Sequence, residues 1–183
     1  MVLKKNSKVY ISIIVILIAI FVIFSLDNSI KQYGNDKESI EKVISSIEGY
    51  ENDSIEILEI KDIYDMRVVG FLSNNNPAYI QFFKNQKGNY EWRHIEKSVN
   101  QSFASYLIQE SNNEAKLLKF MIVTNQANVI SKMQLGINEQ VIQQEFNINQ
   151  KSVTWINLPE SKGDTYTFKY KYYDKDGKLI ADN

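Results

Sequence analysis

Residues 165–173 read Thr-Tyr-Thr-Phe-Lys-Tyr-Lys-Tyr-Tyr, the clearest strand pattern in the chain. Aromatic side chains stand at every second position: Tyr166, Phe168, Tyr170 and Tyr172. Because side chains alternate between the two faces of a strand, these four share one face and the threonines and lysines share the other. This alternation favours an inward, core-facing surface over a carbohydrate-stacking platform. The sequence Asp-Lys-Asp-Gly at 174–177 then predicts a hairpin turn to a last strand at 178–181, rather than the start of a calcium-binding loop.

The segments before this strand show the same period of two. Further strands are predicted at 116–124, 129–135, 141–148 and 152–158, with turn residues at regular intervals between them. Six short strands in about seventy residues are typical of a small immunoglobulin-like β-sandwich, which we place at residues 115–183. The sequence Ser-Asn-Asn-Glu at 111–114 is the best candidate for a linker before it.

A different domain is predicted on the N-terminal side of this linker. Apolar residues with helical spacing (Ile40, Val43, Ile44 and Ile47) indicate an amphipathic helix that Asn35 or Asp36 can cap and that ends before Gly49. Strands are then predicted at 54–61, 66–72, 79–84 and 90–97, and residues 102–109 form either a fifth strand or a short helix. One amphipathic helix on an antiparallel meander predicts an α+β domain at residues 36–110.

An uncharged apolar run occupies residues 9–26 and follows Lys4, Lys5 and Lys8. As a helix this run would be ~27 Å long, close to the ~30 Å hydrocarbon core of a bilayer. We therefore predict a short cytoplasmic tail at 1–8, a transmembrane signal anchor at 9–26, a stalk at 27–35 and an extracellular remainder. A cleaved signal peptide and a buried core helix are the alternatives, but the run is long for either. The expected class is thus α+β: a transmembrane helix, a helix on a meander, and a sandwich.

Composition narrows the chemistry that the chain can perform. Without the three anchor lysines, 18 basic residues face 22 acidic ones, which argues against a nucleic-acid surface. The chain has no cysteine and only one histidine, so thiol chemistry is impossible and the usual zinc ligands are too few. We expect no catalytic residue, no metal and no cofactor.

Two segments are the best candidates for binding. The first contains Trp92, Arg93 and His94; alternation places His94 on the same face as Tyr90 and Trp92, either in a ligand pocket or simply at a sheet edge. The second is the amide-rich segment Asn74, Asn75 and Asn76, which can contact a glycan or a protein or serve only as a turn. The acidic set Glu56, Glu59, Asp62 and Asp65 fits a solvated sheet face better than the paired carboxylates of a glycosidase.

A basic tail, a single anchor and a small cysteine-free ectodomain resemble, in layout only, the uncharacterised single-pass, N-terminally anchored extracytoplasmic proteins of Gram-positive bacteria. The resemblance transfers no functional residue. We expect a non-enzymatic, membrane-tethered binding or accessory module, acting outside the cytoplasm on an envelope protein or a secreted peptide through sheet edges and loops. An immunity-type or regulatory protein that sequesters a toxin or modulates a membrane enzyme is the alternative, and a cell-wall hydrolase is the last choice.

Overall fold

The computed structural model describes residues 16, 32–111, 116–138, 140–159 and 166–182. The chain divides into two compact units, Met1–Gln32 and Tyr33–Asn183. Ile16 is helical and is the one described residue of the predicted anchor; the predicted cytoplasmic tail and most of the stalk lie outside the described residues. Within the described part of the chain, no helix is long and apolar enough to span a membrane.

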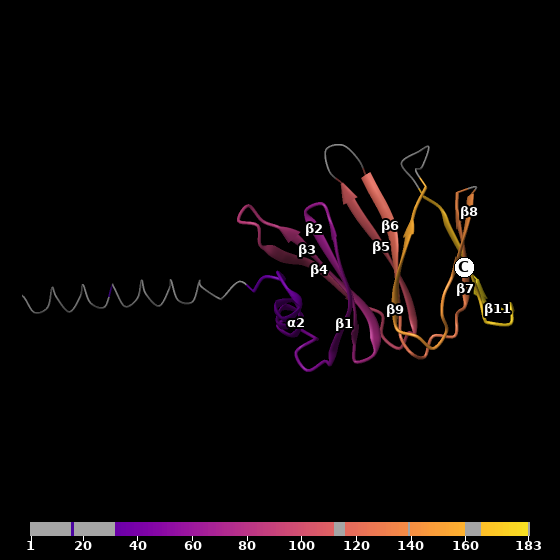
Figure 1. Ribbon diagram of the computed structural model, residues 1–183, viewed down its shortest axis with the longest axis horizontal. Coiled ribbons are helices and arrows are strands. Elements are labelled where there is room, and N and C mark those ends of the chain that lie inside the picture. The colour runs from indigo at the N-terminus through magenta and orange to yellow at the C-terminus, as the bar shows by residue number, and fades with distance from the viewer. Residues whose placement is uncertain (1–15, 17–31, 112–115, 139, 160–165, 183) are drawn as a thin grey trace, which may run out of the picture. The chain divides into compact units, whose positions relative to one another are not determined.

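The second unit contains one described helix and three antiparallel sheets (Figure 1). The helix is α2 (Lys37–Ser45). Sheet A has the order β1 (Ile55–Ile63), β2 (Met66–Ser73), β3 (Asn76–Lys84) and β4 (Tyr90–Lys97). Sheet B has the order β5 (Phe103–Ser111), β6 (Lys116–Thr124) and β9 (Ser152–Asn157). Sheet C has the order β11 (Leu179–Asp182), β10 (Phe168–Tyr173), β7 (Lys132–Ile137) and β8 (Gln140–Glu145).

These elements stack as four layers, which Figure 1 shows from left to right as α2, sheet A, sheet B and sheet C. Three apolar cores separate the layers. Sheet B is buried on both faces: Met121 and Val123 of β6 point into the core shared with sheet A, and Phe120 and Ile122 point into the core shared with sheet C. The middle sheet therefore belongs to two cores at once.

Helix α2 forms where its sequence provides both a cap and an apolar stripe. The Asp36 side chain accepts a hydrogen bond from the Ser39 backbone N–H at 2.9 Å, and the Ser39 hydroxyl oxygen accepts one from the Asp36 N–H, also at 2.9 Å. This reciprocal arrangement satisfies two backbone donors at the helix start. Ile40, Val43 and Ile44 are buried against sheet A.

The predicted fold class is wrong. The described chain is mostly antiparallel β-sheet with one short helix, and it forms a β-sandwich-like all-β stack rather than an α+β domain followed by an immunoglobulin-like sandwich. The finding that overturns the prediction is the pairing of β5 with β6, which runs from Phe103 opposite Thr124 to Ser111 opposite Lys116. The predicted linker at 111–114 thus falls between two strands of one sheet. The aromatic face of β10 does pack inward, because its rings contact Phe120 of sheet B.

Candidate functional site

The first predicted site lies on β4, an edge strand of sheet A. His94 pairs with Gln81 and Trp92 pairs with Phe82, so Arg93 is an extra residue that forms a β-bulge. The bulge moves His94 to the other face of the sheet from Tyr90, which belongs to the core under α2. The His94 ring instead lies 5.4 Å from the ring of Tyr79, which belongs to the core between sheets A and B. The prediction of a shared face is wrong, because strict alternation cannot foresee an inserted residue.

Trp92, Arg93 and His94 are nevertheless accessible. The Trp92 side chain is 42% exposed. The nearest carboxylates are those of Glu91, 3.7 Å from Arg93, and Glu96, 3.7 Å from His94 Nε2. Both contacts are long for ion pairs at an exposed surface, where such pairs contribute about 1 kcal/mol or less.

The second predicted site, Asn74 to Asn76, is a turn whose amides serve the fold. Asn74 and Asn75 have φ values of +48° and +64°, as the two central residues of a tight β-hairpin require. The Asn74 amide donates to Asp53 at 2.5 Å, and the Asn76 amide donates to the Ser73 carbonyl at 3.1 Å. Asn76 lies six residues along β3 from Phe82, the partner of Trp92, or roughly 20 Å at the rise of a strand. The structure does not bring the two predicted sites together.

A cluster of polar contacts surrounds Asp53, a residue that no sequence motif singles out. Its carboxylate accepts hydrogen bonds from Lys97 Nζ at 2.7 Å and from the hydroxyl of the buried Ser73, besides the bond from Asn74. The hydrogen bond from Lys97 lowers the pKa of Asp53, and Lys97 also lies 4.5 Å over the ring of Tyr50. These contacts join the loop after α2 to sheet A, and no local sequence signal links residues so far apart. Their role is structural.

The three members of the acidic set that lie on β1 make contacts within the fold. Asp62 accepts hydrogen bonds from Arg67 Nε at 2.6 Å and from Nη2 at 2.8 Å, and these lower the pKa of Asp62. Glu56 pairs with Lys151 at 2.6 Å. Glu59 accepts a hydrogen bond from the indole N–H of Trp155 at 3.0 Å.

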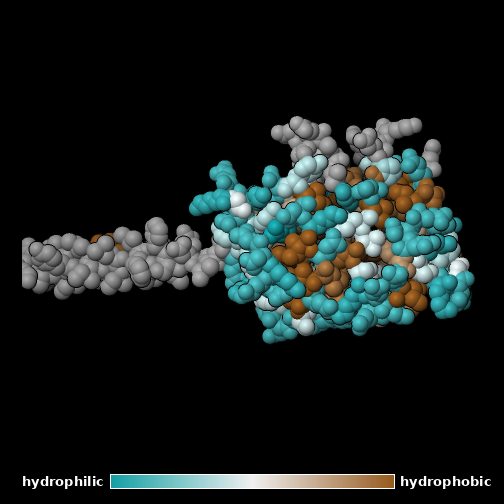
Figure 2. Space-filling model, viewed as in Figure 1, coloured by the Kyte–Doolittle hydropathy of each residue, from teal (hydrophilic) through white to brown (hydrophobic). Residues whose placement is uncertain are grey.

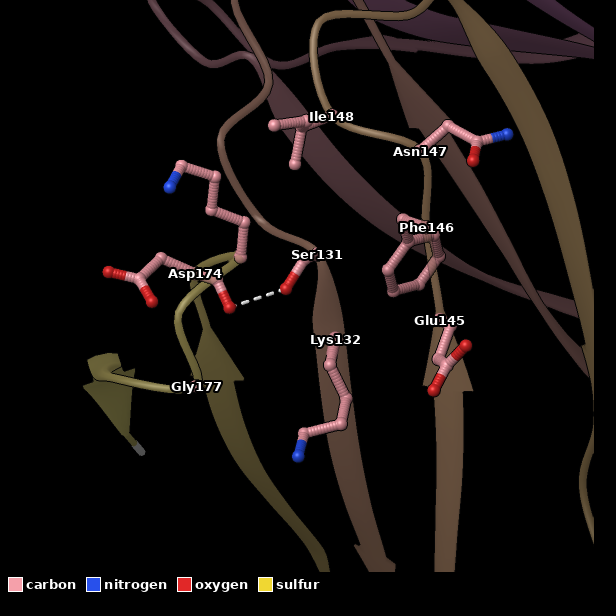
Figure 3. Close-up of a pocket in the computed structure, with 9 residues that line it drawn as sticks. Ser131, Lys132, Glu145, Phe146, Asn147, Ile148, Asp174 and Gly177 are labelled. Atoms are coloured by element: carbon pink, nitrogen blue, oxygen red, sulfur yellow. Dashed lines mark hydrogen bonds between the residues drawn. The ribbon is translucent and has the colours of Figure 1, made fainter.

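A hollow of about 540 Å³ opens at one end of sheet C (Figure 3). Its wall includes Ser131, whose hydroxyl donates to the Asp174 carbonyl at 2.5 Å. The Asp174 carboxylate accepts the backbone N–H groups of Asp176 and Lys178, both at 2.9 Å, so it shapes the hairpin turn between β10 and β11. Among the described residues, no group of three histidine, cysteine or acidic side chains could hold a metal ion.

The outer edge of β5 is one of the two edges of sheet B. The Asn125 N–H donates to the Ser102 carbonyl, and the Leu158 N–H donates to the Leu118 carbonyl. Since hydrogen-bonded and non-hydrogen-bonded pairs alternate along antiparallel strands, these two bonds fix the direction of every backbone group in sheet B. The N–H and C=O groups that point away from β6, which we call the β5 edge, belong to Phe103, Ser105, Leu107 and Gln109. Sheet B places no described strand beside them.

The β5 edge lacks the usual protection of an exposed edge strand. Residues 103–109 contain no charged residue and no proline, and the β5–β6 register has no bulge. Both edges of sheet A, by contrast, carry charged residues and a bulge, near Leu58 on β1 and at Arg93 on β4. Leu107 lies at the middle of the β5 edge and is 42% exposed.

The edge is also recessed relative to sheet A. In the described part of the chain, sheet B has three strands and each of its neighbours has four. Because β5 packs over β3, β6 over β2 and β9 over β1, β4 extends beyond β5 on one side. On the other side Phe103 packs against sheet C, 5.5 Å from Tyr172 of β10 and 5.1 Å from Phe146, just after the end of β8. We call the space beside β5 that β4 overhangs the β5 slot.

Other exposed apolar side chains do not single out a second site. On the face shown in Figure 2, polar residues surround several separate apolar patches. Single exposed apolar side chains, such as Val99 and Val141, are common on soluble folds. Comparison with protein-family models, with curated proteins and with solved structures gives no match.

Proposed function

We propose that this protein is a non-enzymatic binding module that takes up an extended segment of another polypeptide as the missing strand of sheet B. The observation that carries the proposal is the β5 edge. Four alternate residues along this strand direct their backbone N–H and C=O groups away from β6, and these groups have no described partner. An added strand would satisfy those groups, since strand addition draws its affinity from main-chain hydrogen bonds. Alternate side chains of the segment would lie against Leu107 on one face and against β4 on the other.

The recess favours a single strand over a second copy of the chain as the occupant. Two copies could pair their β5 edges only if their projecting β4 strands passed one another. A lone extended segment meets no such obstacle. The overhang of β4 would also hinder self-association of this uncharged edge, a hazard that other folds reduce with charge, proline or a bulge.

The apolar run at 9–26 and the lysines before it support a place for this activity at the outer face of the cell membrane. There the captured segment would belong to an envelope protein or to a secreted peptide. This part of the proposal rests on the sequence alone.

Hydrogen exchange tests the proposal directly. In the free protein, the amides of Phe103, Ser105, Leu107 and Gln109 should exchange quickly, because they point away from β6. The amides of Ala104, Tyr106 and Ile108 should exchange slowly, because they bond to β6. Nine-residue peptides selected from a random displayed library against the full chain should slow the four fast amides. Protection that rises with protein concentration alone would instead identify a second copy as the occupant and overturn the proposal.

Leu107→Pro and Leu107→Ala form a matched pair for the same experiment. Both remove the exposed side chain, but only proline removes the outward N–H and obstructs an added strand. Since this N–H has no partner in the β5–β6 ladder, both variants should keep the wild-type circular dichroism spectrum. The proline variant should lose peptide binding by tenfold or more, while the alanine variant should lose less. Equal binding by the two folded variants would contradict strand addition.

A further inference from the structure

Glu96 projects from β4 into the β5 slot. It lies directly opposite Tyr79 on β3, and the Tyr79 ring is 4.5 Å from the ring of Tyr106 on β5. Burial raises the pKa of Tyr79 to about 12, and the nearby Glu96 carboxylate adds to this shift. Burial also raises the pKa of Tyr106, and the Glu96 carboxylate adds to this shift as well.

Two other carboxylates, Asp53 in the loop after α2 and Asp62 on β1, form ion pairs with Lys97 and Arg67, respectively. Among the described residues, no lysine or arginine forms an ion pair with Glu96. An ionisable neighbour of Glu96 is His94, whose Nε2 lies 3.7 Å from the Glu96 Oε2 atom. This histidine carries a charge only when it is protonated. The Glu96 side chain is 53% exposed, so it remains accessible to a group that enters the slot.

We infer that the segment bound in the β5 slot carries a lysine or arginine that pairs with Glu96. The inference rests on the proposed function and specifies the partner's chemistry. In an added strand, the residue opposite Tyr106 places its side chain on the same face as Tyr106, toward β4. A long basic side chain there lays its aliphatic stem along the Tyr106 and Tyr79 rings and brings its cation to Glu96. The residues on either side of it point to the face of Leu107 and are apolar. The preferred partner is therefore an extended segment with a basic residue between two apolar ones.

Three fluorescein-labelled peptides of nine residues test this preference by anisotropy against the full chain. Each alternates valine and threonine and has lysine, glutamine or glutamate at its centre, flanked by valine. The lysine peptide should bind roughly three- to fivefold more tightly than the glutamine peptide, and the glutamate peptide most weakly, as expected for one partly exposed ion pair. Glu96→Gln should remove the preference for lysine. The matched control Glu48→Gln, at an exposed position after α2, should keep it.

The outcomes separate this inference from the function beneath it. If all three peptides protect the β5 edge amides but bind equally well, the inference of a basic residue in the bound segment is wrong. The proposal of strand addition is then retained. If Glu96→Gln keeps the full preference for lysine, the cation is recognised elsewhere and the role of Glu96 is overturned. If neither these peptides nor library-selected ones protect the edge amides, both proposals fail.

Discussion

Gly34 lies just before α2 and packs against the Phe82 ring of the sheet A core. Its N–H donates to the Tyr90 carbonyl at 2.9 Å, and its carbonyl accepts from Arg67 Nη1 at 2.9 Å. A Cβ atom at this position would lie 2.3 Å from the Phe82 ring. Gly34→Ala should therefore lower the free energy of unfolding by about 1–3 kcal/mol, the usual range for overpacking. The measurement is denaturant unfolding, with Gly136→Ala as the control, since a Cβ at Gly136 meets its nearest atom at an ordinary 3.4 Å. An equal loss in the two variants would contradict the steric argument.

Asp53 and Asp62 make folding stability depend on pH. Hydrogen bonds from Lys97 and Arg67 hold their pKa values below that of an ordinary aspartate. In acid the unfolded chain therefore takes up protons at these positions before the folded chain does, and stability falls as pH drops below about 4. Asp53→Asn and Asp62→Asn should be less stable than wild type at neutral pH but should lose less stability between about pH 5 and pH 3. Urea unfolding across this range is the measurement. Acid slopes as steep as that of wild type would contradict the assignment.

The cap of α2 is the feature of this helix most open to test. The short helix stands alone on one face of sheet A, and its start depends on the reciprocal bonds of Asp36 and Ser39. Asp36→Ala should lower the free energy of unfolding by about 1 kcal/mol, the typical cost of removing an N-cap. Lys37→Ala, next to the cap and exposed, is the control and should change stability little. A loss as large in the control would mean that the cap contributes nothing of its own.

Elements were predictable from sequence where the signal is local. The Asp36 cap is one of the two caps predicted, and β4 spans the predicted residues 90–97. Pairing was not predictable, because β6 joins both its hairpin neighbour β5 and the distant β9, and periodicity does not specify partners. The candidate site depends on pairing: residue types drew attention to Trp92, Arg93 and His94, whereas the β5 edge follows from which strand ends a sheet. An inserted residue such as Arg93 reverses a predicted face without any local warning.

Because sheet B contributes to two cores, we expect the second unit to unfold in a single cooperative transition. Since β6 fills one core with Met121 and Val123 and another with Phe120 and Ile122, loss of sheet B exposes both at once. Leu135→Ala leaves a cavity in the core between sheets B and C, and Ile80→Ala leaves one in the core between α2 and sheet A. Both side chains are fully buried. Each variant should cost about 2–5 kcal/mol and shift the same single transition. Circular dichroism and tryptophan fluorescence should coincide through urea unfolding in both. Two transitions, with each variant moving only one, would show that the layers fold independently and that the shared middle sheet does not couple them.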